Sequence, residues 1–481
     1  MKVRLDRALA GRTLIFAAFL LWPLILFGRP TYLMGDSLAY LKTGQQAVEF
    51  AESKISSRVP GPAPADAVDP AGNPDPAPAA RGADTKSARS VTYSVAAYAL
   101  RWPGQDLTAL AAVQVLAVSI LCAIIGSVLE LGRLRSYAAV AAIAAFATPL
   151  AAFAAFTVPD IWAGVLLGAM TLLIATGDRL SFGVKSYLAL VIMFAILAHA
   201  SIPPIAAGMT IIGVVCFVFQ RRTHLKISAR MLSWLLLPIL FGFGANIAIN
   251  YISFGKVSAT GKRIPTALAR SIAQGPGKWY LEEQCKTPRY AVCEIYGTKI
   301  PGTINGFLFD KNSLNDLATP EQMDRIRAQE SEIVFRAAMT YPGVEARKLA
   351  SGILKQLVTF DLGLTNFKRQ VEMGADGLPT LAESGRDHSA LLHTIDILVI
   401  MLLVLSAGWV FLRYRQLHAE ERNMLLLLVL GMLGNALVCS AFSGVAERYQ
   451  ARIVWLFPVF ILFMIASRFA AETRASAENR A

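Results

Sequence analysis

The chain has 481 residues, of which 55% are hydrophobic and 16% charged, and several apolar stretches approach or exceed the length that crosses a bilayer. This composition excludes a single soluble domain and predicts an all-α polytopic membrane protein. The net charge of +13 does not by itself indicate nucleic acid, because in a membrane protein such an excess marks cytoplasmic loops rich in Lys and Arg. We therefore expect the lipid bilayer as a partner and no nucleic acid.

Hydropathy predicts about ten transmembrane helices. Their approximate ranges are 13–29, 108–131, 137–157, 160–177, 186–202, 203–220, 231–253, 390–412, 423–443 and 453–470. The Pro203-Pro204 pair suits a tight turn between the fifth and sixth spans, although this region could also form one broken or re-entrant element. No internal repeat is evident, which disfavours transporter folds built from two matching halves.

Basic residues orient these spans. Segment 1–30 has Lys2, Arg4 and Arg7 before its apolar stretch, so the positive-inside rule places the N-terminus in the cytoplasm. Each short connection that then falls inside is basic, and the chain would end inside with Arg468, Arg474 and Arg480, so that 471–481 is a cytoplasmic tail. The first span lacks a small-x-small cleavage site, so we expect an uncleaved anchor rather than a signal peptide.

Two large segments would then face outward, separated by the spans in 108–253 and followed by those in 390–470. The first outer segment, 31–107, has an Ala/Pro-rich tract between Gly61 and Pro78. Such a tract cannot bury a core, so we expect a flexible insertion there.

The second outer segment, 254–389, is predicted to be a small helical domain. Cys285 and Cys293 lie eight positions apart with no further ligand at metal-binding spacing, which predicts a disulfide and an oxidising compartment. Thr319-Pro320-Glu321 is typical of a helix start, and Pro342 can begin another amphipathic helix. That second helix could pack on the membrane part of the protein or lie at the lipid interface.

Two acids are predicted to lie on the outer face. Asp36 follows the first span, where it could be an ordinary loop acid or a general base that takes a proton from an attacking hydroxyl. Asp160 stands in a very short turn between two spans, where it could cap the following helix, take part in a site, or do both. Acids at a lipid boundary are costly, which favours a functional role.

Basic and aromatic residues share this face. Arg448, Tyr449 and Arg452 lie in a short outward connection, where the arginines could anchor at the interface or bind a phosphate. His199 could be a buried hydrogen-bonding residue or a substrate contact, and Lys256 a solvated charge or a headgroup contact. The candidate site is completed by Tyr40. Gly275-Pro276-Gly277-Lys278 lacks the Ser/Thr of a phosphate loop, so no nucleotide site is expected.

The pattern resembles the GT-C superfamily of polytopic glycosyltransferases, which use polyprenyl-phosphate-linked sugars. The resemblance rests on Asp36 in Gly35-Asp36-Ser37-Leu38-Ala39-Tyr40, on Asp160 after the third span, and on Arg448-Tyr449-Gln450-Ala451-Arg452 before the last. It also rests on segment 89–94, which resembles the aromatic or proline-containing stretch of the family's first outer loop, and on segment 274–293, which looks like part of uncharacterised bacterial relatives. This sequence has a single Asp36 where a paired Asp-Glu is common in the family, and its Ala/Pro-rich insertion is unusual.

The resemblance implies a glycosyltransferase of the bacterial inner membrane with a periplasmic active site. The donor would be a polyprenyl-phosphate-linked sugar, and the acceptor a cell-envelope glycan, lipid or protein. Some relatives use a divalent metal, and the residues here leave that cofactor open. A transporter or flippase of lipid-linked glycans, a polysaccharide polymerase or ligase, and a structural scaffold are the alternatives.

Overall fold

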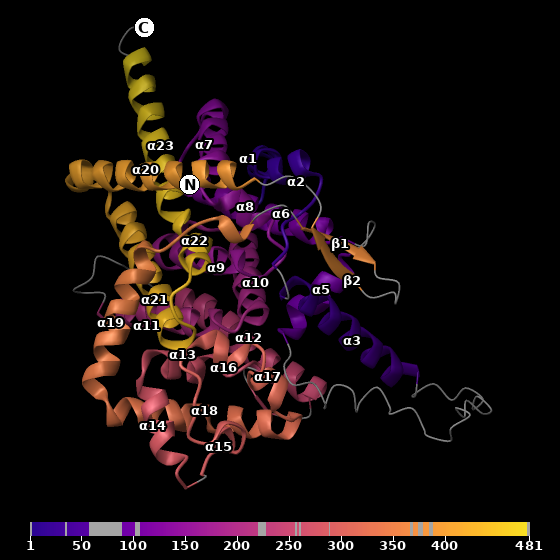
Figure 1. The fold of residues 1–481 in the computed structure, drawn as a ribbon. Coiled ribbons are helices and arrows are strands. Elements are labelled where there is room, and N and C mark those ends of the chain that lie inside the picture. Colours follow the sequence, from indigo (N-terminus) through magenta and orange to yellow (C-terminus); the bar gives the residue numbers. More distant parts are fainter. Residues whose placement is uncertain are drawn as a thin grey trace.

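The computed structural model describes residues 2–33, 36–56, 89–101, 106–219, 228–254, 257–258, 261–287, 289–365, 369–373, 379–383 and 388–478. These residues form an almost entirely helical protein (Figure 1). Within the described ranges the strands are β1 (Arg369–Met373) and β2 (Pro379–Glu383), which pair antiparallel as a hairpin.

Seven helical segments of the described chain are long and apolar enough to cross a membrane. They are α1 (Arg7–Leu20) with α2 (Trp22–Phe27), α6 (Thr108–Val128), α9 (Ile161–Thr176) with the 3-10 turn η1 (Gly177–Arg179), α12 (Ala229–Phe254), α20 (Ser389–Arg413) with the 3-10 turn η3 (Tyr414–Gln416), α21 (Ala419–Phe442), and α22 (Glu447–Val454) with α23 (Leu456–Glu478). The other three predicted spans correspond to shorter apolar helices: α7 (Leu134–Phe146), α10 (Phe182–Ala198) and α11 (Ile202–Val218). The chain is an all-α membrane protein.

Proline explains three departures from the predicted boundaries. The prediction of a continuous helix over 137–157 is wrong, because α7 ends before Pro149 and a separate helix, α8 (Leu150–Ala154), follows. The first span is interrupted at Leu21, and a new helix, α2, begins at Trp22 with Pro23 in its first turn. The pair after Ile202 stands in the first turn of α11, where proline is tolerated, and the turn itself is formed by residues 199–201.

The apolar helices pack into a bundle with one large hydrophobic core. The span that begins with α9 is the most enclosed, with 89% of its most apolar stretch buried, whereas the corresponding figure for α20 is 17%. In Figure 1, α20 runs across α23 at one end of the bundle. α9 is therefore central, and α20 leaves most of its apolar surface uncovered by the described chain.

Helices of the second predicted outer segment build a core of their own, which we call the second core. They are α13 (Thr266–Gln274), α14 (Pro276–Gln284), α15 (Ala291–Tyr296), α16 (Ile304–Leu308), α17 (Leu314–Leu317) and α18 (Pro320–Thr340). A disulfide joins Cys285 after α14 to Cys293 in α15. Thr319 and Gln322 form a capping box at the start of α18, as the predicted helix start requires.

Helix α19 (Pro342–Val358) connects the second core to the bundle. It packs along α21, and its buried face consists of Gly352 and Gln356. A Cβ on Gly352 would stand 3.2 Å from Ser440 of α21, so the glycine permits a close approach of the two helices. α19 thus packs on α21 along one face, while Leu354 and Val358 on its other faces are exposed, and a position at the lipid interface remains a prediction.

The first outer segment contributes two helices, α3 (Asp36–Ser56) and α5 (Val91–Ala99), which lie side by side. A Cβ on Gly44 of α3 would collide with the Ser94 carbonyl oxygen of α5, so the backbones touch there. Most of the segment between them, including the Ala/Pro-rich tract, lies outside the described residues. The division of the chain into the predicted outer and inner segments remains a prediction.

Candidate functional site

Asp36 and Arg448 meet although they lie 412 positions apart in the sequence. Asp36 is the first residue of α3 and Arg448 lies in the first turn of α22, and Nη1 of Arg448 is 3.4 Å from Oδ2 of Asp36. Arg89, just before α5, donates to the other oxygen, Oδ1. The side chains of Asp36 and Arg448 keep 23% and 21% of their surface exposed, so a ligand could reach this ion pair.

A second acid–arginine pair lies deeper. Nη1 of Arg452 is 3.3 Å from Oδ1 of Asp160, and their side chains are 0% and 2% exposed. Asp160 occupies the N-cap position of α9, but its side chain makes no capping hydrogen bond. The helix-cap interpretation of Asp160 therefore does not describe its side chain, whose carboxylate faces Arg452 instead. The pairing offsets the cost of burying both charges.

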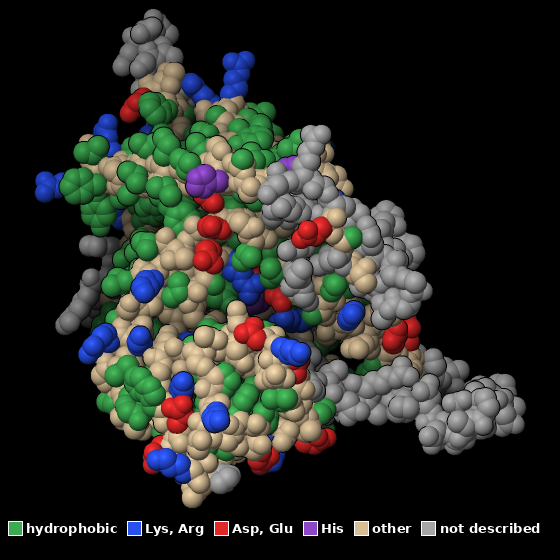
Figure 2. Space-filling view, in the orientation of Figure 1, with side chains coloured by type: hydrophobic (Ala, Val, Ile, Leu, Met, Phe, Trp, Pro, Cys, Tyr) green, Lys and Arg blue, Asp and Glu red, His purple; other side chains and the backbone are tan. Residues whose placement is uncertain are grey.

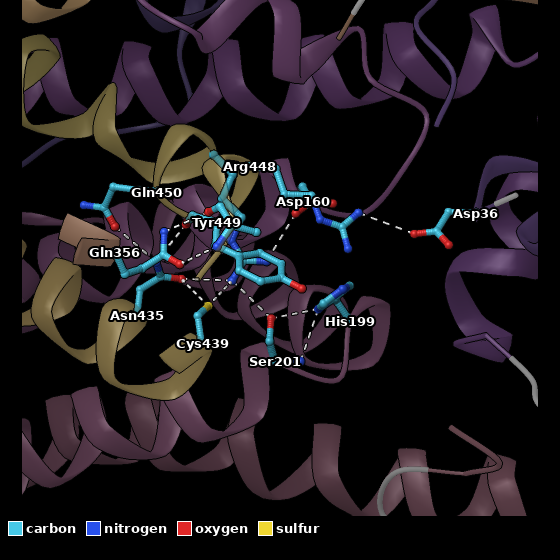
Figure 3. A network of polar contacts seen from close by, with 12 residues as sticks. Asp36, Asp160, His199, Ser201, Gln356, Asn435, Cys439, Arg448, Tyr449 and Gln450 are labelled. Carbon is cyan, nitrogen blue, oxygen red and sulfur yellow. Dashed lines mark hydrogen bonds and ion pairs between the residues drawn. The ribbon is translucent and has the colours of Figure 1, made fainter. Parts of the chain in front are cut away.

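Both terminal nitrogens of the Arg452 guanidinium donate to side chains of the protein, whereas its buried Nε has no hydrogen-bond partner among the described residues. Figure 3 shows its partners Asn435, Cys439 and Ser201 close together. Its Nη2 donates to Oδ1 of Asn435 at 2.9 Å, to Oγ of Ser201 at 3.2 Å and to Sγ of Cys439 at 3.4 Å. Asn435 and Cys439 stand one turn apart on α21, whereas Ser201 precedes α11. Four elements thus hold Arg452 in place: α9, α21, α22 and the turn before α11.

His199 is bound within that turn. The Ser201 backbone N–H donates to its Nδ1 at 3.1 Å, and Oγ of Ser201 lies 2.8 Å from the same nitrogen. Because Ser201 also contacts Arg452, His199 is linked to the deeper pair. The ring of Tyr449 lies 5.2 Å from Cζ of Arg448 and 5.2 Å from Cζ of Arg452, within cation–π range of both.

Tyr40 is buried between α3 and α5. The centroids of the Tyr40 and Tyr93 rings lie 4.9 Å apart, and the two rings are arranged edge to face. The Tyr93 hydroxyl donates to Oε1 of Gln114 at 3.0 Å. Nε2 of Gln114 donates in turn to the carbonyl oxygens of Ala154 and Phe156. This chain of contacts fixes α3 and α5 against the bundle, so Tyr40 positions the helix that begins with Asp36.

A short extended segment before α3 pairs with the residues before α9. Residue 31 pairs in parallel with residue 156, and Oγ of Ser37 lies 3.0 Å from Oγ1 of Thr157. Ser37 follows Asp36 and Thr157 precedes Asp160 by three positions. Backbone pairing therefore brings the start of α3 to the start of α9.

The site lies between the bundle and the second core. Figure 2 shows acidic and basic side chains gathered in a hollow near the middle of the drawn face, between the places that Figure 1 gives to α22 and the start of α3. Guanidinium groups there are suited to an anion. Among the described residues no three His, Cys, Asp or Glu side chains come together in a way that could hold a metal ion.

The structure thus brings together Asp36, Asp160, His199, Arg448, Tyr449 and Arg452, with Tyr40 behind them. Lys256 lies outside the described residues, and the Cys285–Cys293 disulfide belongs to the second core. Arg89, Ser201 and Asn435 were not predicted as site residues. Asn435 had a usable signal, since it is an amide inside an apolar helix.

Comparison with known proteins gives no family: no family model, no curated protein and no solved structure matches the chain. The functional argument therefore depends on the geometry of these residues.

Proposed function

We propose that the protein is a membrane glycosyltransferase that moves a sugar from a polyprenyl phosphate to an acceptor hydroxyl on the outer face of a bacterial inner membrane. The observation that carries this proposal is the exposed Asp36–Arg448 pair above the buried Asp160–Arg452 pair. One carboxylate and one guanidinium at the exposed end supply the two groups that such a transfer needs, a base and an anion-binding residue.

Asp36 is the general base. Its carboxylate takes the proton of the acceptor hydroxyl as the acceptor oxygen forms a bond to the anomeric carbon of the sugar. The bond between that carbon and the phosphate oxygen breaks, and the polyprenyl phosphate leaves with the electron pair. Attack opposite to the leaving group inverts the anomeric configuration. Because the donor is already activated, no nucleotide is consumed.

Arg448 binds the phosphate, where negative charge grows as the bond breaks. Its guanidinium fork suits phosphate oxygens, and its side chain remains partly exposed. Arg452 was expected to share this task, but its side chain is fully buried and both of its terminal nitrogens, Nη1 and Nη2, already donate to side chains of the protein. We propose that Arg452, together with Asp160 and His199, holds α22 in place from the buried side of the site.

Asp36→Asn tests the base. The amide keeps the size of the side chain but cannot take a proton, so transfer of labelled sugar from a polyprenyl-phosphate donor should fall by about 10²–10⁴-fold. Glu49→Gln is the matched control, because Glu49 is an exposed acid on the same helix. It should keep full transfer.

Both variants are purified in detergent and compared by elution profile before assay, so that a folding defect is recognised. Unchanged transfer by a well-folded Asp36→Asn protein would contradict the proposal. It would favour the alternative in which the arginines bind a lipid-linked glycan for transport without chemistry.

A further inference from the structure

Arg89 occupies the exposed end of the candidate site together with Arg448. It donates to Asp36 through Nη2, and its side chain is 35% exposed, compared with 21% for Arg448 and 0% for Arg452. Its backbone is anchored by the next residue, because Ser90 caps α5 and donates through Oγ to the carbonyl oxygen of Leu197 in α10. The backbone of Arg89 is therefore held in place, while its guanidinium remains accessible.

Charge is unevenly distributed between the two levels of the site. At the buried level Arg452 and Asp160 form one pair of opposite charges. At the exposed level Arg89 and Arg448 share the single carboxylate of Asp36. Two guanidinium groups against one carboxylate leave one positive charge in excess, and this excess lies where a ligand can reach it. An anion is the ligand that this arrangement favours.

The shared carboxylate also has a consequence for catalysis. Both carboxylate oxygens of Asp36 already accept from a guanidinium, Oδ1 from Arg89 and Oδ2 from Arg448. An acceptor hydroxyl therefore has to compete with these two arginines for its place beside Asp36. An incoming anion offers the arginines a replacement partner of the same charge and similar geometry.

We propose that Arg89 is a second anion-binding residue, and that the phosphate of the lipid donor takes Arg89 and Arg448 away from Asp36. Asp36 is then released to act as a base only in the donor complex. The anion site stands on the ion pairs themselves, whereas the release of a base rests on the proposed function. The ligand is a phosphate group, which a membrane can supply on a lipid headgroup and the solvent as free phosphate.

A double-mutant cycle separates contact with the anion from a role in holding Asp36. Binding of polyprenyl monophosphate in phosphatidylcholine nanodiscs is measured for the wild type, Arg89→Gln, Asp36→Asn and the double variant. Arg89→Gln should weaken binding by about tenfold or more, as expected for a charge-assisted hydrogen bond. Asp36→Asn should strengthen it, since both arginines lose their competing partner.

The double variant distinguishes direct contact between Arg89 and the anion from an indirect role of Arg89 in holding Asp36. If Arg89 contacts the anion, Arg89→Gln weakens binding in the Asp36→Asn background as well. If Arg89 only holds Asp36, the substitution has no effect in that background, and the inference is overturned. Arg89→Lys should bind better than Arg89→Gln because it keeps the charge. Arg101→Gln is the control, since Arg101 follows the same helix and contacts Tyr98 instead.

Competition by inorganic phosphate identifies the source of the anion. Displacement of the lipid only at a large excess of inorganic phosphate supports a lipid headgroup, whereas equal affinity for both overturns that part of the inference. If the cycle behaves as expected but the wild type transfers no sugar, the anion site stands and the proposed function fails. If the wild type binds neither probe, the anion site is refuted.

Discussion

Arg448 and Arg452 are one helical turn apart on α22 and nevertheless have different surroundings. Arg448 is partly exposed beside Asp36, whereas Arg452 is fully buried with partners on α9, on α21 and before α11. A guanidinium that is enclosed in this way positions other groups, and one that reaches the surface can bind a ligand. We therefore assign the two arginines of this short helix different roles: Arg452 positions other groups, and Arg448 binds a ligand.

The buried pair leads to a prediction about stability. Arg452→Met should destabilise the protein by about 3–5 kcal/mol, because it leaves the Asp160 carboxylate buried without its partner. Arg452→Lys should not restore stability, since an ammonium cannot reproduce the fork that contacts Asp160 and Asn435. Thermal unfolding in detergent measures both variants.

Arg448→Met is the matched control on the same helix and should cost much less stability, because the Asp36 pair is partly solvated and Arg89 remains in contact with it. Equal losses of stability for Arg448→Met and Arg452→Met would contradict the division between an exposed and a buried pair.

At the scale of single residues, the sequence predicted much of the candidate site. Charges are rare near the spans, so Asp160, Arg448 and Arg452 stood out against an apolar background. Arg89 did not stand out, because it follows a long polar segment in which an arginine is unremarkable. That Asp160 would face Arg452 also required the three-dimensional arrangement, since N-capping explained its position equally well.

At the scale of elements, α19 connects the second core to the start of α22. The buried side chain of Gln356 donates to the Ala446 carbonyl oxygen at 2.9 Å and accepts from the Ala446 N–H at 3.0 Å. Ala446 is the N-cap residue of α22, two positions before Arg448. At the other end of α19, Glu345 forms a salt bridge with Arg270 of α13. Gln356 is therefore a positioning residue for α22.

Gln356→Met tests this role, because it keeps the side-chain length and removes both hydrogen bonds. Each buried group left without a partner costs about 1–3 kcal/mol, and the start of α22 should become less ordered. We expect affinity for polyprenyl monophosphate to fall by about 3–10-fold. Lys355→Met, at an exposed neighbouring position, should leave affinity unchanged. A loss of thermal stability with unaltered affinity would contradict the positioning role.

Hydrophobic runs predicted the existence of the apolar helices well and their interruptions poorly. The break after α7 depends on Pro149, which a long run of alanines on both sides obscured. The helices α3 and α5 were not predicted, because their contact is made by Gly44 and the Ser94 backbone rather than by a long apolar stripe. Close backbone approach leaves little trace in hydropathy.

At the scale of the whole molecule, the site depends on both ends of the chain. α1 to α3 supply Asp36, the centre supplies Asp160 and His199, and α21 and α22 supply the arginines with their partners. The bundle buries the deeper pair, whereas the Asp36–Arg448 pair keeps part of its surface exposed. Residues from three distant parts of the chain therefore form one site.

Labelling of a cysteine at position 448 tests this account most directly. Arg448→Cys is made in a background in which the buried free cysteines Cys122, Cys216 and Cys439 are replaced by alanine, while the disulfide is kept. A membrane-impermeant maleimide should label the introduced thiol from outside the cell. Gln450→Cys, at a fully buried position of the same helix, should stay unlabelled. Labelling of the Arg448→Cys variant only from the cytoplasmic side would contradict a donor site on the outer face.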